Sequence, residues 1–137
     1  MRWPSMELEG RRLTMKRVAD IPIEGEVVKS DVSISFLGDV DPLTGLVQDR
    51  KNNLYGQTIK DKVFAFPMGK GSTVGSYIMY RMHKNGNAPK AVLNERSEVI
   101  VAVGAVISDI PLLDRIDLGQ LRTGQRVRII GGKVEVL

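Results

Sequence analysis

The chain has 137 residues, of which 42% are hydrophobic and 26% are charged. These values are typical of one folded domain, and they exclude a multidomain enzyme and wholesale disorder. Cysteine is absent, which excludes a disulfide framework, a thiolate zinc site, a cysteine nucleophile and an iron–sulfur cluster held by this chain's own thiols. The net charge of +4 comes from scattered basic residues, which indicates a mildly basic surface and no nucleic-acid stripe.

The apolar segments are too short to cross a membrane. The longest run, Val99–Ile107, has nine residues, whereas a membrane-spanning helix needs about twenty. Charged residues, including Glu7, Glu9 and Arg11, precede any apolar stretch at the N-terminus, so the sequence shows no hydrophobic region of a secretory signal. We therefore expect a cytoplasmic protein that does not interact with membranes.

The first third of the chain predicts a tail, strands and a turn. Residues 1–12 lack hydrophobic periodicity, so we expect a poorly ordered tail before one domain over residues 13–137. Residues 24–28 resemble the start of a strand, and residues 33–37 alternate between polar and apolar side chains, which predicts a second strand. Residues 38–45 are rich in turn formers and predict a polar loop.

A short buried strand and a helix follow. The apolar run Val63–Phe66 ends at Pro67, which cannot donate to a strand ladder and therefore ends the predicted strand. After a glycine-rich turn, apolar residues recur at helical spacing up to a stop at Asn85 and Gly86. The expected apolar face of this helix consists of Val74, Tyr77, Ile78 and Met82.

The last third predicts further strands. Residues 91–93 and 99–103 are apolar runs that we expect as buried strands. Residues 127–130 and 134–136 flank two glycines and predict a closing hairpin. Strands that alternate with a helix indicate one α/β domain.

A strand, a glycine-rich turn and a helix together form an arrangement that can bind an anion, because backbone N–H groups and the helix dipole converge there. Residues 69–75 are therefore the first candidate site. They do not fit a Walker A loop, since Phe64 and Gly71 stand where glycine and Ser or Thr are needed. They do not fit a dinucleotide-binding turn either, since Val74 stands where its third glycine would be.

Two interpretations of Ser72 remain open from the residues alone. Ser72 or Thr73 can simply cap the following helix, a role for which both residue types are preferred. Alternatively, Ser72 is reactive, which requires stabilisation of its alkoxide by the helix N-terminus, neighbouring glycine amides and Lys70. The only histidine, His83, lies about three turns further along the helix, and we interpret it as a surface residue.

Other candidates have ordinary structural explanations. Asp39 and Asp41 have a spacing compatible with metal binding or acid–base work, but they also lie in a segment of turn formers. Arg126 and Arg128 alternate along a predicted strand and are expected to face water, with a phosphate contact as the alternative.

Seven segments in combination resemble one known family. They are SFLG at 35–38, DPLTG at 41–45, VFAFP at 63–67, GKGSTVGSY at 69–77, KNG at 84–86, AP at 88–89 and IVAVGA at 100–105. They resemble the small subunit of the aconitase X family, from about Gly10 to the C-terminus. Within that family the similarity is greatest to archaeal-type phosphomevalonate dehydratases.

This resemblance implies a fold and a partner. The fold would be a swivelling β/β/α domain equivalent to the mobile C-terminal domain of aconitase. It would dock, as a heterodimer, on a large subunit that holds an iron–sulfur cluster, of the [4Fe-4S] type, through its own cysteines. The absence of cysteine here agrees with that division of labour.

The resemblance also implies a reaction. The enzyme would be a hydro-lyase that dehydrates mevalonate 5-phosphate to trans-anhydromevalonate 5-phosphate, in the modified mevalonate pathway of isoprenoid biosynthesis. Ser72 would be the proton acceptor, and Lys70, Gly71, Thr73 and Val74 would bind the substrate or stabilise negative charge. Neither subunit would be active alone.

Two departures from the family pattern concern substrate contacts. Asp39 stands where many relatives have a second glycine, and residues 50–53 replace a more usual proline-containing segment. Related enzymes dehydrate other hydroxy acids, including cis-3-hydroxyproline, which remains an alternative substrate. A non-catalytic anion-binding module and a small basic RNA-binding barrel are further alternatives.

Overall fold

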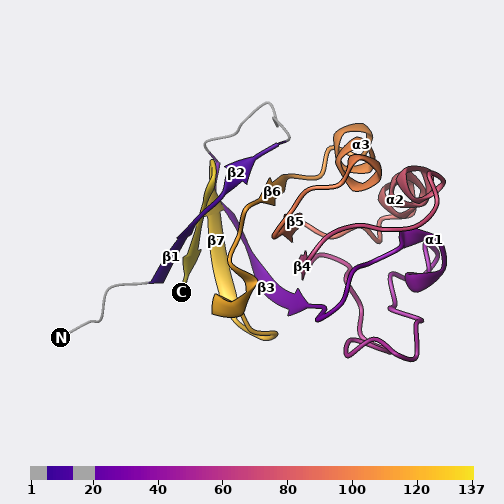
Figure 1. Cartoon of the computed structure of the whole chain (residues 1–137), viewed down its shortest axis with the longest axis horizontal. Helices are drawn as coiled ribbons and strands as arrows, with labels where there is room; N and C mark the ends of the chain where they lie inside the picture. The colour runs from indigo at the N-terminus through magenta and orange to yellow at the C-terminus, as the bar shows by residue number, and fades with distance from the viewer. Residues whose placement is uncertain (1–5, 14–20) are drawn as a thin grey trace.

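The computed structural model describes residues 6–13 and 21–137. Within these residues, eight strands form one mixed sheet in the order β1-β8-β7-β3-β4-β5-β6-β2 (Figure 1). The strands are β1 (Met6–Glu9), β2 (Arg11–Arg12), β3 (Ile23–Lys29), β4 (Val63–Phe66), β5 (Ala91–Asn94), β6 (Leu112–Asp114), β7 (Arg126–Ile130) and β8 (Lys133–Val136). The α-helical segments of the same residues are α1 (Phe36–Asp39), α2 (Gly75–Lys84) and α3 (Val99–Ile107), and a 3-10 turn spans Leu118–Gln120.

One half of the sheet is parallel and carries the helices. Strands β3, β4, β5 and β6 pair in parallel, and α2 and α3 make the crossovers from β4 to β5 and from β5 to β6. The two helices lie side by side on one face of these strands (Figure 1). Loops that follow parallel strands gather at one edge of a sheet, where α/β proteins commonly place their sites.

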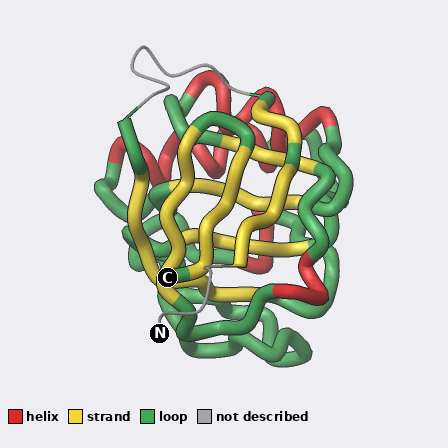
Figure 2. The backbone as a smooth tube through the Cα atoms, turned by 90° about the vertical axis from the view of Figure 1, so that its left-hand side faces the viewer, coloured by secondary structure: helices red, strands yellow, loops and turns green. Residues whose placement is uncertain are grey.

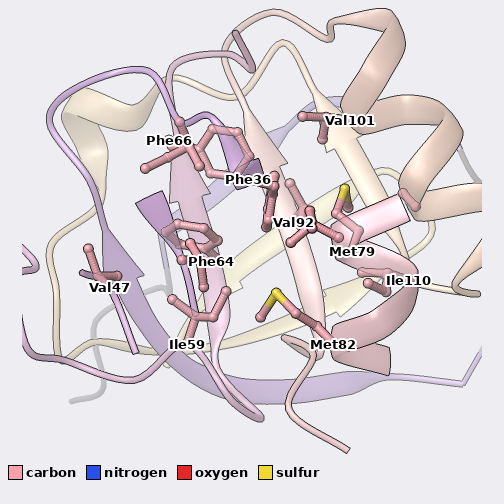
Figure 3. Close-up of a cluster of buried hydrophobic side chains, with 14 of the residues drawn as sticks. Phe36, Val47, Ile59, Phe64, Phe66, Met79, Met82, Val92, Val101 and Ile110 are labelled. Atoms are coloured by element: carbon pink, nitrogen blue, oxygen red, sulfur yellow. The ribbon is translucent and has the colours of Figure 1, made fainter. Parts of the chain in front are cut away.

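The side chains of the parallel strands alternate between two hydrophobic cores, which explains why all of β4 is buried. Phe64 and Phe66 face the helices, whereas Val63 and Ala65 face the opposite side. On the helical side, Phe36 of α1 packs edge-on against both rings, with centroids 6.2 Å from Phe64 and 6.0 Å from Phe66 (Figure 3). Phe36 thereby anchors the segment that contains it against the sheet.

The other half of the sheet is antiparallel. Strand β3 belongs to both halves: residues 27–29 pair in parallel with β4, and residues 23–26 pair antiparallel with β7. Strands β7, β8 and β1 continue the antiparallel half and cross in front of the other strands (Figure 2). Their inward side chains, including Val127, Ile129 and Val134, fill the second core. The expected β/β/α arrangement is therefore confirmed.

Several predicted elements are confirmed. The expected strands at Val63–Phe66 and residues 91–93 are β4 and β5. The expected helix is α2, and it ends at Lys84, directly before Asn85. Of its expected apolar face, Ile78 and Met82 are buried, whereas Val74 and Tyr77 are exposed. The closing hairpin is formed by β7 and β8 across Gly131 and Gly132.

The expected strand at residues 99–103 is wrong, because this segment is the first half of helix α3. The carboxylate of Glu98 accepts hydrogen bonds from the N–H groups of Ile100 and Val101 and so caps the helix. Gly104 lies so close to Met79 of α2 that a Cβ would collide with the side chain of Met79. Helix capping and close helix packing therefore override the β-branched composition. No helix within the described residues is long and apolar enough to span a membrane.

The expected strand at residues 33–37 is also wrong. Only Ile34 makes an isolated parallel bridge, to Gly69, and the chain then turns at α1. The carboxylate of Asp39 accepts a hydrogen bond from the N–H of Ser35 at 2.8 Å, and Gly38 has a φ of +104°. These features close a turn, which interrupts the strand.

The structure differs from the expected tail over residues 6–12. Strand β1 pairs with β8, and β2 pairs with β6. The two strands are short and lie at the two ends of the strand order, so their sequence carries little apolar periodicity. Residues 1–5 of the expected tail lie outside the described residues.

Candidate functional site

The glycine-rich residues 69–75, here called the serine loop, connect the end of β4 to the start of α2 at the carboxyl edge of the parallel strands. The loop is tied to the segment before α1. The N–H of Ile34 donates to the carbonyl of Met68 at 3.1 Å, and the N–H of Lys70 donates to the carbonyl of Ile34 at 2.9 Å. These backbone bonds extend the sheet by one bridge and hold the first residues of the loop.

Two positions of the serine loop require glycine. Gly71 has a φ of +89°, and a Cβ there would collide with the side chain of Ser35. At Gly69, a Cβ would lie 2.6 Å from Oε2 of Glu98 and would also collide with Val101. The loop therefore passes closely between the α1 segment and the first turn of α3, which a side chain at either position would prevent.

Ser72 is half-buried at the bend of the loop. Its Oγ accepts a hydrogen bond from the N–H of Val74 at 3.1 Å, and its carbonyl accepts one from the N–H of Gly75 at 3.0 Å. The N-cap position of α2 is occupied by Val74, which makes no side-chain cap bond. Ser72 thus stabilises the turn before α2, and its Oγ already accepts a hydrogen bond from one backbone N–H.

The amides before Val74 are open. Within the described residues, no protein group accepts a hydrogen bond from the N–H groups of Gly71, Ser72 or Thr73. Lys70 is exposed, and its ammonium group makes no hydrogen bond or ion pair with a described residue. Adjacent free amides beside an unpaired cation, at the start of a helix, are suited to bind an anion.

The first turn of α3 supports the serine loop. The Ser76 hydroxyl donates to the carbonyl of Ile100 at 2.7 Å, and Glu98 both caps α3 and lies beside Gly69. The sequence analysis did not name Ser35, Ser76 or Glu98 as site residues, although Ser35 and Ser76 lie in two of the seven family-like segments. Glu98 had a separate signal, an acidic residue directly before a long apolar run.

The two carboxylates considered as a catalytic or metal pair each close a turn. Asp39 accepts from the N–H of Ser35, and Asp41 accepts from the N–H of Leu43 at 2.9 Å. No group of three or more His, Cys, Asp or Glu residues that could hold a metal ion is present within residues 6–13 and 21–137. The turn interpretation therefore accounts for both carboxylates.

The remaining candidates lie away from the serine loop. His83 is exposed near the C-terminal end of α2, where it lines a cavity of about 320 Å³. Arg128 donates to the carboxylate of Glu24 at 2.9 Å and forms a longer ion pair with Glu135. Arg126 is exposed on the same strand. Arg128 is thus held within the antiparallel half.

Comparison with known proteins identifies the family. A family model described as the aconitase X swivel domain matches residues 12–136. The chain belongs to the aconitase X swivel domain family. This membership confirms the resemblance of the seven sequence segments and the α/β fold that it implied.

Members of the aconitase X swivel domain family with curated names are closely similar. The phosphomevalonate dehydratase small subunit of Thermococcus gammatolerans is 50% identical over 134 residues, which cover 96% of this chain and 98% of the relative. The protein of the same name from Pyrococcus horikoshii is 48% identical over 128 residues, which cover 92% and 96%. That from Methanococcoides burtonii is 47% identical over 131 residues, which also cover 92% and 96%.

Two solved structures of similar chains agree with the aconitase X swivel fold. The crystal structure of Thermococcus kodakaraensis aconitase X in its holo-form superposes with a TM-score of 0.90 at 47% identity. The superposition covers 96% of this chain and 98% of the solved chain. The solution NMR structure of a UPF0107 protein superposes with a TM-score of 0.83 at 37% identity, and it covers 96% and 99%.

The aconitase X relationship implies an iron–sulfur enzyme, and we tested whether this chain has suitable ligands. Protein-bound iron–sulfur clusters are held mainly by cysteine thiolates, and the sequence contains none. The residues of this chain therefore do not fit a cluster.

Proposed function

We propose that this chain is the small subunit of a phosphomevalonate dehydratase and that Ser72 is the proton acceptor. Near 50% identity over almost the whole length to small subunits of that name supports the enzyme and its substrate. The position of Ser72, with a backbone donor on its Oγ and a lysine two residues before it, supports the role of the side chain. The similarity of the relatives is the observation that carries the proposal.

The reaction determines what Ser72 has to do. Dehydration of mevalonate 5-phosphate breaks a C–H bond next to the carboxylate and a C–O bond at the neighbouring carbon, forms a C=C bond and releases water. A serine oxygen can accept that proton only as an alkoxide, whose negative charge needs stabilisation. The N–H of Val74, 3.1 Å from Oγ, is placed to provide it. The charge of Lys70 and the N-terminus of α2 act in the same direction.

The open amides have a separate role in this proposal. Because the N–H of Val74 is engaged by Ser72, the amides of Gly71, Ser72 and Thr73 remain for an anionic group of the substrate. Lys70 supplies a positive charge beside them. A carboxylate or a phosphate fits these donors equally well, since both present several acceptor oxygens.

The rest of the site belongs, in this proposal, to a larger partner. The relatives are named small subunits, which implies a larger one, and we propose a heterodimer. An iron–sulfur cluster, of the [4Fe-4S] type, is assigned to the partner because this chain has no cysteine. Lys70, Gly71 and Thr73 are exposed, so a substrate at Ser72 needs further walls from the partner.

One specific observation also favours a second candidate function. Open amides and Lys70 would let the serine loop hold a phosphate without catalysis. Such an anion-binding module would not depend on the hydroxyl of Ser72. The two functions are therefore separated by a substitution that removes only this oxygen.

The test is anaerobic coexpression with the phosphomevalonate dehydratase large subunit of the same organism, followed by an assay for loss of mevalonate 5-phosphate. We expect activity only with both chains, and a loss of at least about 10³-fold in kcat for Ser72→Ala in an assembled complex. Thr44→Ala is the matched control, because Oγ1 of Thr44 likewise accepts from the N–H two residues on, at 3.3 Å, in a distant turn.

The outcomes separate the alternatives. Equal activity of Ser72→Ala and wild type would remove Ser72 from the role of base. Turnover of cis-3-hydroxyproline in place of mevalonate 5-phosphate would replace the substrate and retain the hydro-lyase. Phosphate binding without any turnover by the assembled complex would favour the anion-binding module.

A further inference from the structure

Helix α3 has an unusual composition for a helix on the surface. Its nine residues, VIVAVGAVI, include no polar or charged side chain. Val101, Gly104 and Ala105 are buried, and α3 packs against α2. A helix that is apolar on all sides is normally buried on all sides.

The opposite side of α3 is exposed. Val99 is 74% exposed, Val106 is 62% exposed, Ile107 is 50% exposed and Val103 is 46% exposed. Positions 99, 103, 106 and 107 follow one face of a helix. Figure 1 shows α3 at the outer border of the molecule, beside α2. Isolated exposed apolar residues are ordinary, but a continuous apolar face indicates an interaction surface.

This face continues to the serine loop. The Cβ that glycine lacks at position 75 would lie 3.2 Å from Cγ2 of Ile100, and Ser76 binds the carbonyl of Ile100. Val99 therefore lies beside the start of α2, where Val74 and Tyr77 are also exposed.

On the other side of the loop, exposed Leu37 follows the Ser35–Phe36 pair whose serine contacts Gly71. We call these exposed residues the apolar rim. They are Leu37, Val74, Tyr77, Val99, Val103, Val106 and Ile107.

We propose that the apolar rim is the surface on which the larger subunit docks, through an apolar face of its own, an inference that rests on the proposed function. The serine loop needs a second wall to enclose a substrate, and the rim begins at the loop, where Val74 and Val99 lie, and continues along α3. A partner that supplies this wall must cover the rim, and burial of these side chains stabilises the closed complex.

A second copy of this chain is a poorer occupant. A twofold contact brings the same patch of both copies together. Contact through the rim would therefore bring two Lys70 cations, each without a partner among the described residues, into one interface with no opposite charge from the serine loop to balance them. It would also add no chemical group that the serine loop lacks.

The test measures association of the purified chain with the large subunit, by sedimentation or native mass spectrometry, for Val103→Glu, Val106→Glu and the double variant. We expect each single variant to bind at least about tenfold more weakly, because the interface would bury an unpaired carboxylate. Ile130→Glu is the matched control, since Ile130 is 42% exposed but lies on β7. Thermal unfolding of each isolated chain verifies that the variants remain folded.

Three results would overturn this assignment. The first is unchanged association of all α3 variants, with activity still dependent on Ser72, which would leave the proposed function intact. The second is a wild-type chain that sediments as a dimer and becomes monomeric with Val103→Glu, which would make a second copy the occupant. The third is a wild-type chain that is folded but does not bind the large subunit, in which case the Ile130→Glu control would not bind either. This result would overturn the proposed function as well.

Discussion

Arg11 of β2 and Asp114 of β6 are joined by two side-chain hydrogen bonds, of 3.0 and 2.9 Å. Asp114 is almost fully buried, whereas the guanidinium of Arg11 remains half-exposed. The pair fastens β2 to β6, the last strand of the parallel half. A buried carboxylate that loses its partner is costly, so this contact has measurable consequences for stability.

The stability of the chain should depend on the charge of Asp114. Burial raises the pKa of this carboxyl, but hydrogen bonds from Arg11 and Ser97 outweigh burial and hold the pKa below its ordinary value of 3.8. A depressed pKa in the folded state adds stability above the ordinary pKa, and this stability is lost as pH falls through the lowered value. We expect Asp114→Asn to lower the free energy of unfolding by about 2 kcal/mol at pH 7.

Denaturant titrations from pH 7 to pH 2 measure this effect. The difference between wild type and Asp114→Asn should shrink as pH falls through the lowered pKa of Asp114, because protonation removes the charge that the asparagine lacks. A difference that stays constant while the Asp114 carboxyl is seen to titrate, for example by NMR, would show that the charge of Asp114 is not its source.

Gly71→Ala should destabilise the chain more than a left-handed backbone alone explains. The added methyl would need a φ of +89° and would collide with Ser35. Gly124→Ala is the matched control, because Gly124 has a φ of +97° but no atom within 4 Å of the added Cβ. We expect a loss of about 1 kcal/mol for the control and about 2 to 3 kcal/mol for Gly71→Ala in denaturant titrations. Equal losses would exclude a role for the contact with Ser35.

Gly104→Ala should destabilise the chain although alanine favours helices by about 1 kcal/mol over glycine. The added Cβ would meet Met79, which is almost fully buried in α2. We expect a net loss of about 1 to 2 kcal/mol. In a double-mutant cycle with Met79→Ala, the second substitution should recover part of this loss, and additive effects would contradict the proposed contact.

Lys70→Gln should lower activity without lowering stability. Lys70 is exposed and has no partner among the described residues, so its removal should change the free energy of unfolding by less than about 0.5 kcal/mol. If Lys70 binds an anionic group of the substrate, kcat/KM of Lys70→Gln should fall about 10- to 100-fold. Lys70→Arg keeps the positive charge and should therefore retain more of the wild-type kcat/KM than Lys70→Gln. Unchanged kinetics of the assembled complex would remove Lys70 from the site.

The sequence was most informative for strands whose side chains are buried on both faces of the sheet. Residues 63–66 and 91–93 are buried throughout, and short, fully apolar runs of this kind indicate strands of a parallel sheet. Residues 99–103 have the same composition but form a helix. The deciding interactions, from Glu98 to two amides and from Gly104 to Met79, depend on tertiary structure.

The candidate site was only partly predictable. The glycines and Ser72 are visible as a motif, because their residue types limit the backbone. Ser35 and Glu98 contact the loop across distances of 36 and 29 residues from Gly71 and Gly69, and no local pattern connects them to it. The sequence predicted amides of Gly71 and Thr73 that face an anion, but that these amides have no acceptor within the described residues could be seen only in the fold.

The pairing of Met6 with Val136 has a practical consequence for experiments. Both of these residues lie in the antiparallel half, on the opposite side of the molecule from α2 and α3 (Figure 1). A chain immobilised through Leu137 would therefore present the serine loop and its neighbouring helices to the solution. Surface-attached measurements of subunit binding can thus be made with a C-terminal tag, whereas a label on α2 or α3 would obstruct the surface under study.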